Sequence, residues 1–312
     1  MRSPARIDVH QHVVPPFWAE ALPLHGGDPS GWKTPDWSPD AAIEFMDSLG
    51  IATGILSLTA PGIVGWHDEE RRTMARRVND YTAGLVAERP DRFGNFATLP
   101  LPDIDGALRE LARAIEDLGA DGVVLFSNYD GTYLGDPSLA PLWAELARRD
   151  VVVFVHPTKP DIPIINGMPG PMIDYPFDTT RTAVHMVLGG VFERHPDLRI
   201  ILSHAGGFLP YAAERFAQIG ALLDPERPAS AILGDFRRFH VDTALSASAP
   251  TIAGLLAFTP RSQILFGSDF PYAPAALGKT FTAMLDAAPG LSEQDRAAIS
   301  RGNAGSLFAR LT

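Results

Sequence analysis

The stretch Asp8-Val9-His10-Gln11-His12 lies inside the first apolar run of the chain, and the fold can be worked out from it. Side chains alternate between the two faces of a β-strand, so His10 and His12 point the same way. Two imidazoles on one face of a strand are poor material for an apolar core but suit a metal chelate. The stretch therefore predicts a strand that carries part of a metal site.

Three later apolar runs also end on polar side chains. They are Val151–His156, Ile200–His204 and Ile264–Asp269. If these runs are parallel strands of one barrel, their C-terminal ends meet over one mouth, which is where a (β/α)8 barrel keeps its catalytic groups. We therefore expect these three terminal side chains to lie beside the two histidines of the first strand.

Strand-like and helix-like segments alternate along the whole chain. The expected strands are Ile7–Val14, Thr53–Leu58, Phe93–Thr98, Val123–Phe126, Val151–His156, Ile200–His204, Phe239–Val241 and Ile264–Asp269. The expected helices are Ser38–Leu49, Asp68–Glu88, Asp103–Leu118, Pro137–Arg149, Asp178–Glu193, Pro210–Ile219, Pro250–Phe258, Pro274–Ala287 and Ser292–Arg310. This pattern predicts an α/β fold, a (β/α)8 TIM barrel. No linker-like stretch divides the chain, so residues 1–312 are expected to form one domain.

Two long connections interrupt the alternation. Residues 15–39 are rich in proline, glycine and tryptophan, and residues 157–177 are rich in proline. Loops this long in a compact domain are usually functional or part of an interface. We expect both to act as lids over the barrel mouth, although a packed surface excursion explains the first equally well. The helix after the second is expected to start at the capping residues Asp178-Thr179-Thr180.

Composition limits the partners and the location. The chain has 26 basic and 37 acidic residues and a net charge of −11, without a basic stretch, which argues against nucleic acid. It has no cysteine, so disulfides and thiolate metal sites are excluded. No apolar run is long enough to span a membrane, and the segment before the first strand has no signal-peptide character. A cytoplasmic location is expected, and a small anionic substrate would need positive charge, which a metal could supply.

The polar strand ends contain a plausible ligand set for one metal ion. The candidates are His10, His12, His156 and Asp269. Three imidazole nitrogens and one carboxylate suit Zn²⁺, with Mn²⁺ or another divalent ion as the alternative. The fourth strand, Val123–Asn128, contains no lysine that could be carboxylated to bridge two metals, so one ion is expected. His204 then stays free to act as acid, base or orienting group.

This arrangement resembles the signature of the amidohydrolase superfamily, which has His-x-His on strand one, His on strands five and six, and Asp on strand eight. The resemblance covers nearly the whole chain. Within the superfamily the chain is most similar to the non-oxidative decarboxylases related to aminocarboxymuconate semialdehyde decarboxylase, and to 6-methylsalicylate decarboxylase-like proteins. The motifs that carry this are Asp28–Trp32, Asn128–Gly131, Phe154–Thr158, Phe177–Arg181, His204–Gly207 with Pro210-Tyr211, and Gly267–Pro271.

The resemblance implies roles for particular residues. His10, His12, His156 and Asp269 would be the metal ligands, and His204 the proton-handling histidine. Arg215 would bind the substrate carboxylate, in some relatives from the other subunit of a dimer, so a homodimer is expected; an exposed helix charge is the alternative reading. Asn128, Tyr129 and Phe270 are assigned to substrate binding. Tyr129 and Phe270 could line an aromatic pocket together with Trp18, Trp32, Trp66 and Tyr272, although packing is the favoured reading for each aromatic residue taken singly.

The implied activity is metal-dependent, non-oxidative decarboxylation of a small hydroxylated aromatic acid of salicylate type, or of a related unsaturated carboxylic acid. His204 or a nearby acid would protonate the ring carbon before CO₂ leaves. Two alternatives stay open. A hydrolase of an ester, amide or lactone would activate water at the metal, with His204 or Asp269 taking its proton. A catalytically silent binding barrel would be expected to have lost ligands, whereas all five polar positions are present.

Overall fold

Eight parallel strands form the centre of the molecule in the computed structural model, which describes residues 5–163 and 165–311. Their order in the sheet is β1-β2-β3-β4-β7-β8-β9-β10. These strands are β1 (Arg6–Val13), β2 (Ile51–Leu58), β3 (Phe93–Thr98), β4 (Gly122–Phe126), β7 (Val152–His156), β8 (Arg199–Leu202), β9 (His240–Asp242) and β10 (Ile264–Leu265). A separate antiparallel hairpin, which the sequence did not predict, consists of β5 (Asn128–Tyr129) and β6 (Thr132–Tyr133).

Backbone hydrogen bonds between β1 and the segment after β10 bring the sheet back onto itself. The amide of Val9 donates to Phe266 O at 3.0 Å, and the amide of Asp269 donates to His10 O at 2.8 Å. The strand order and these bonds make the sheet a barrel of the TIM type, so the predicted fold is confirmed.

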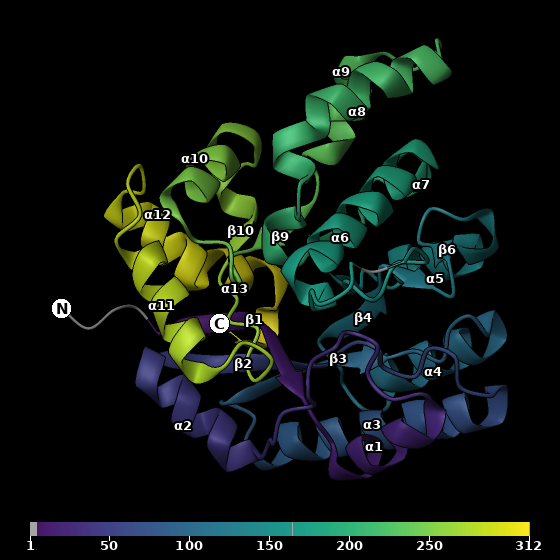
Figure 1. Ribbon diagram of the computed structural model, residues 1–312, viewed down its shortest axis with the longest axis vertical. Helices are drawn as coiled ribbons and strands as arrows, with labels where there is room; N and C mark the ends of the chain where they lie inside the picture. Colours follow the sequence, from purple (N-terminus) through teal and green to yellow (C-terminus); the bar gives the residue numbers. More distant parts are fainter. Residues whose placement is uncertain (1–4, 164, 312) are drawn as a thin grey trace.

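Helices surround the strands, and Figure 1 shows α8 and α9 reaching farthest from the barrel. The helices are α1 (Pro16–Ala21), α2 (Pro39–Leu49), α3 (Asp68–Glu88), α4 (Ile104–Glu116), α5 (Ala140–Arg148), α6 (Gly170–Leu188), α7 (Val191–Arg194), α8 (Leu209–Leu223), α9 (Ala229–Phe236), α10 (Ala249–Phe258), α11 (Ala275–Asp286), α12 (Glu293–Ala297) and α13 (Asn303–Leu307). Short helical turns are η1 (Leu22–His25), η2 (Pro137–Leu139), η3 (His204–Gly206), η4 (Arg261–Gln263), η5 (Ala298–Gly302) and η6 (Ala309–Leu311).

Several helices begin where the sequence predicts, because the capping side chains are in place. Ser38 accepts a hydrogen bond from the amide of Ala41 at the start of α2, and Asp103 does the same for Gly106 at the start of α4. Each bond satisfies an amide that has no partner within the helix. Local sequence therefore sets these boundaries before any tertiary packing.

A bulge in β1 turns both histidines into the barrel. Between the pairs Asp8–Gly54 and Gln11–Leu56, β1 has one more residue than β2. Val9 belongs to the apolar cluster inside the barrel, and the ring of the next residue, His10, also points inward, with its centroid 4.9 Å from that of Phe154. Such a bulge re-aims the side chains that follow it, so the strand supplies core residues first and polar groups after them.

The predicted start of the helix after the second long connection is wrong. Helix α6 begins at Gly170, so Asp178 lies in its middle and caps nothing, and the connection ends at residue 169. The sequence-based boundary failed because Pro176 reads as a helix breaker. The helix accommodates it, and Thr180 adds a side-chain hydrogen bond to Pro176 O at 2.9 Å.

The first long connection is also more ordered than predicted. It contains α1 and η1, and the side chain of Trp18 is fully buried, with its indole N–H donating to Gly62 O at 2.8 Å. Trp18 is therefore a packing residue. Residues 5–163 and 165–311 contain no helix with both the length and the apolar character that crossing a membrane would take.

Candidate active site

His10 and His12 meet the carboxylate of Asp269 at the barrel mouth. The Nε2 atoms of the two histidines are 3.1 Å apart. Asp269 Oδ1 lies 3.0 Å from His12 Nε2 and 3.3 Å from His10 Nε2. All three side chains are buried, so water contributes little to stabilising the charges that gather there.

The other ring nitrogen of each histidine is held by a neighbouring strand. His10 Nδ1 lies 2.7 Å from Asp242 Oδ2 on β9, and His12 Nδ1 lies 3.1 Å from Ser57 Oγ on β2. When Nδ1 carries the proton toward these acceptors, the Nε2 lone pairs point to the centre of the site. Histidines that bind metals are oriented in this way by groups behind them.

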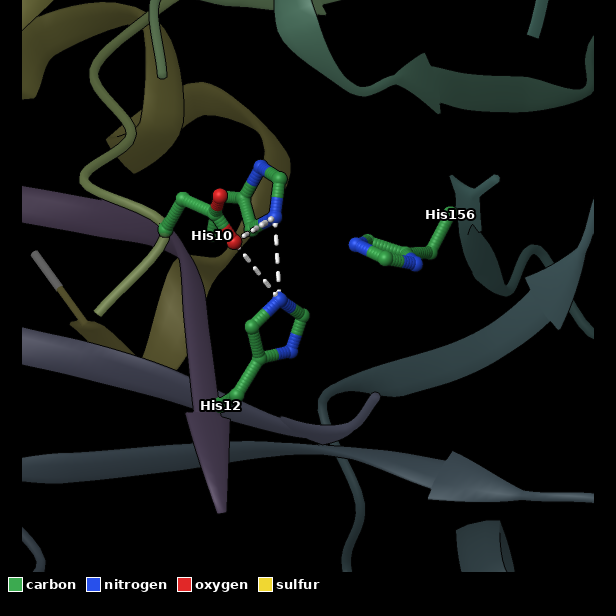
Figure 2. Close-up of side chains that lie close together, drawn as sticks. His10, His12 and His156 are labelled. Atoms are coloured by element: carbon green, nitrogen blue, oxygen red, sulfur yellow. Dashed lines mark hydrogen bonds and ion pairs between the residues drawn. The ribbon is translucent and has the colours of Figure 1, made fainter. Parts of the chain in front are cut away.

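His156 completes the group from the far side of the barrel. Figure 2 shows its ring pointing from β7 toward His10 and His12, which come from β1. The ring centroids are 4.7 Å from His12 and 5.3 Å from His10. One ligand atom from each of these histidines and from Asp269 lies within 4.8 Å of the others. The structure thus brings together the four side chains that the sequence predicts as metal ligands.

The ionisable side chains of this group shift one another's pKa values. Burial opposes a charge on His10, but Asp242 and Asp269 outweigh it and raise the pKa of His10 to about 10. Burial likewise opposes the charge on Asp269, yet the neighbouring His10 keeps the pKa of Asp269 well below its usual range. Burial and the adjacent imidazoles lower the pKa of His156. A proton on His10 compensates Asp269 in the protein alone, and a bound divalent ion fits the same place with three neutral imidazoles.

His204 stands beside the group of four. It opens the turn η3, and both His204 and Asp269 have positive φ angles, 51° and 62°. Non-glycine residues rarely adopt such angles, and they occur where the surrounding structure enforces them. His204 Nε2 lies 3.5 Å from Asp269 Oδ2, and the amide of His204 donates to Asp242 at 2.9 Å. Asp242, the residue after the expected strand Phe239–Val241, therefore positions two histidines.

A cavity of about 330 Å³ lies above these residues. This volume is at the lower end of the range for small-molecule sites. Its walls are mainly apolar and aromatic, and the polar residues among them include His156, His204 and Asp269. The lining residues are Asp28, Ser30, Trp32, Thr59, Ala60, His156, Pro171, Met172, Tyr175, Pro176, His204, Leu245, Ser246, Asp269, Tyr272, Ala273, Leu277 and Phe281.

Comparison with known proteins shows the family. The amidohydrolase family profile matches residues 7–310. The chain is a member of the amidohydrolase family. It is 43% identical over 323 residues to the decarboxylase yanB of Aspergillus niger, covering 98% of this chain and 88% of that protein. It is 40% identical over 315 residues to the 6-methylsalicylic acid decarboxylase of Penicillium expansum, covering 98% of this chain and 97% of that protein.

A solved structure shares the whole architecture. The dihydroxybenzoic acid decarboxylase from Polaromonas sp. JS666, with bound manganese and the inhibitor 2-nitroresorcinol, superposes on this amidohydrolase with a TM-score of 0.81. The two are 28% identical, and the match covers 98% of this chain and 97% of that one.

The residues assigned to substrate binding lie outside the cavity lining. Tyr129 is buried, and its hydroxyl accepts a hydrogen bond from the amide of Phe126 at 3.1 Å. Phe270 stacks on Phe45 with a centroid distance of 4.2 Å. Arg215 is exposed on α8. Their contact with a substrate stays a prediction. Of the six aromatic residues named as a candidate pocket, Trp32 and Tyr272 line the cavity.

Asn128 belongs to a buried network centred on Asp178, which sequence reasoning assigned to helix capping. Asp178 accepts hydrogen bonds from Asn128 Nδ2 at 2.7 Å, from Tyr133 OH at 2.6 Å and from Ser127 Oγ. Three donors hold this carboxylate although burial raises its pKa. The sequence signal that could have indicated this network is the pair of polar residues, Ser127 and Asn128, directly after the apolar run Val123–Phe126.

The same network clamps the backbone at His156 and directly after it. The amide of Ser127 donates to His156 O at 2.9 Å, and the amide of Thr158 donates to Ser127 Oγ at 3.0 Å. His156 Nδ1 itself has no hydrogen-bond partner in the described part of the chain. The orientation of the His156 ring therefore depends on this backbone clamp, and so on Asp178. The rings of His10 and His12, in contrast, are held directly by hydrogen bonds to their Nδ1 atoms.

Replacing His12 should remove metal from this amidohydrolase. We expect His12→Ala to lower metal content several-fold, because it deletes one of four ligand atoms. Elemental analysis after mild purification gives the value. His185→Ala, outside the group, is the control and should keep wild-type content. A reproducible two ions per chain in the wild type would contradict the single-ion site.

Asp178→Asn should weaken metal binding without touching a ligand. Loss of the charged acceptor loosens the clamp around His156, and such supporting residues typically contribute ~10–100-fold to metal affinity. Competition with a chelator measures this, and the Co²⁺ absorption spectrum reports the changed ligand geometry. Asp130→Asn, an exposed carboxylate in the neighbouring turn, is the matched control. An unchanged Co²⁺ spectrum and affinity would mean that the clamp does not position His156.

Proposed function

We propose that this chain is a metal-dependent, non-oxidative decarboxylase of a small hydroxylated aromatic acid of salicylate type. The observation that carries the proposal is the position of three histidines and one aspartate at the floor of an apolar cavity sized for one aromatic ring. The decarboxylase names of the relatives at 40–43% identity support it. Residues 7–310, which match one family profile, act as a single domain.

His10, His12, His156 and Asp269 would hold one divalent ion. The imidazole-rich set favours Zn²⁺, and the manganese in the Polaromonas enzyme makes Mn²⁺ the alternative. When bound, the ion would stabilise negative charge on the substrate's carboxylate and neighbouring hydroxyl oxygens. The substrate ring would then lie between the apolar walls formed by α6 and by residues 15–39, and we propose that these segments keep water from it.

His204 would handle the proton. It lines the cavity beside Asp269, so it can reach the ring carbon that bears the carboxylate. A proton moves from Nε2 to that carbon, and the ring loses its aromaticity. The bond from that carbon to the carboxylate then breaks, CO₂ leaves, and the electron pair restores the aromatic ring. Asp269, whose Oδ2 lies 3.5 Å away, would stabilise the protonated imidazole.

We further propose that the protein works as a homodimer. No lysine or arginine is among the described residues that line the cavity. Arg215 lies on α8 together with exposed apolar side chains, among them Tyr211 and Leu222, which are 93% and 79% exposed. Such an apolar surface is typical of an interface. A second copy docked there could bring its Arg215 to the substrate carboxylate.

His204→Asn should keep the metal and lose turnover. The variant removes a proton donor but none of the four proposed ligands, so we expect the rate to fall by about 10²–10⁴-fold with metal content near wild type. Rates with a panel of hydroxybenzoates and elemental analysis of the same samples test this. A metal-free variant would instead make His204 a ligand.

Decarboxylation in D₂O should place one deuterium on the carbon that carried the carboxylate, because the proton replaces CO₂ at that atom. Mass spectrometry and proton NMR of the phenol product locate it. Esters, amides and lactones are tested in parallel. Efficient cleavage of one of them, with no CO₂ from any hydroxybenzoate, would assign a hydrolase.

A further inference from the structure

A carboxylate that plays no part in the proposed reaction faces the same cavity. Asp28 belongs to the long connection after β1 and is one of the lining residues. Its Oδ1 accepts a hydrogen bond from the amide of Ser30 at 2.8 Å. Its Oδ2 is buried and has no hydrogen-bond partner among the described residues. A buried carboxylate oxygen without a donor is costly, so its presence here suggests a role toward whatever occupies the cavity.

The start of α6 helps to fix the loop that carries Asp28. The amide of Gly170, at the start of α6, donates to Ser30 O at 2.9 Å and joins the loop to that helix. Burial raises the pKa of Tyr175 and of Tyr272, the two tyrosines beside the histidines, and the negative charge of the nearby Asp28 raises both further. Tyr272 packs against His12 at a centroid distance of 5.8 Å, so this tyrosine connects the surroundings of Asp28 with the cluster of histidines.

The charged side chains around the cavity supply more negative than positive charge. A divalent ion with Asp269 leaves one net positive charge at the floor, enough for one substrate carboxylate. The nearby Asp242 and Asp28 add only negative charge, and no lysine or arginine is among the described lining residues. A second carboxylate on the substrate would lie near Asp28 in a poorly solvated space, where like charges repel strongly.

We propose that Asp28 makes the cavity selective for aromatic acids with a single carboxylate, and that it accepts a hydrogen bond from a neutral donor on the bound ring. The proposal rests on the decarboxylase function proposed above and narrows its substrate class. Asp28 thereby acts as a specificity-determining residue that repels a second carboxylate.

Binding of matched ligand pairs separates charge from size. The probes are salicylate, 5-carboxysalicylate and its uncharged isostere 5-carbamoylsalicylate, together with the corresponding 4-substituted pair. Calorimetry on wild-type protein loaded with one equivalent of Zn²⁺ or Mn²⁺ gives the dissociation constants without requiring turnover. We expect the carbamoyl ligand to bind at least tenfold more tightly than the carboxyl ligand at one or both ring positions.

Asp28→Asn should reduce this preference to less than threefold while salicylate still binds. Asp36→Asn removes an exposed carboxylate from the same loop and should keep the full preference. Asp28→Ser provides a second variant if the first is unstable. Equal binding of the two members of both pairs by the wild type, or an unchanged preference in the Asp28 variants, would overturn the proposal alone. Failure of the metal-loaded wild type to bind or turn over any hydroxybenzoate would instead defeat the proposed function, and this inference with it.

Discussion

The need for a positive charge at the barrel mouth organises this molecule. Imidazole lone pairs and a carboxylate oxygen meet within a few ångströms in a buried space, where they would repel one another without a cation. Side chains from neighbouring elements hold these ligand groups close together despite the repulsion. Asp242 holds His10, Ser57 holds His12, and the network of Asp178 holds the backbone of His156. Four different strands and one helix contribute, so the site depends on closure of the whole barrel.

The backbone at Asp269 is held in an unfavourable conformation beside the ligand cluster. Asp269 lies four residues beyond the end of β10, where its amide bonds back to β1, and it has a positive φ angle. The segment is tied by Asp8, which accepts hydrogen bonds from the amide of Ser268 at 3.0 Å and from its hydroxyl at 2.5 Å. Asp8 is fully buried, and burial raises its pKa to about 7. One buried carboxylate thus joins the first and last strands beside the metal ligands and stabilises a backbone conformation that is unfavourable by itself.

The parts that sequence could predict are those with a strong local or periodic signal. Alternation along β1, apolar runs that end in His or Asp, and β/α repetition gave the barrel and the four clustered side chains. The bulge in β1 left no such signal, because it depends on pairing with β2. The start of α6 was missed because Pro176 reads as a breaker, although tertiary packing tolerates it. Asp178 was assigned to helix capping because its actual partners, Ser127 and Tyr133, are distant in sequence and meet it only in the folded chain.

The ligand set alone does not choose between hydrolysis and decarboxylation, since both reactions can use histidines, an aspartate and a divalent ion. The walls of the cavity make the difference. Hydrolysis needs a water molecule beside the scissile carbonyl, whereas protonation of an aromatic carbon benefits when water is excluded and the ring is held flat between apolar surfaces. Trp32, from the long connection after β1, and Met172, near the start of α6, both contribute such surfaces. In this barrel the residues at the strand ends would supply the charge for catalysis, while these two wall segments would determine which reaction that charge serves.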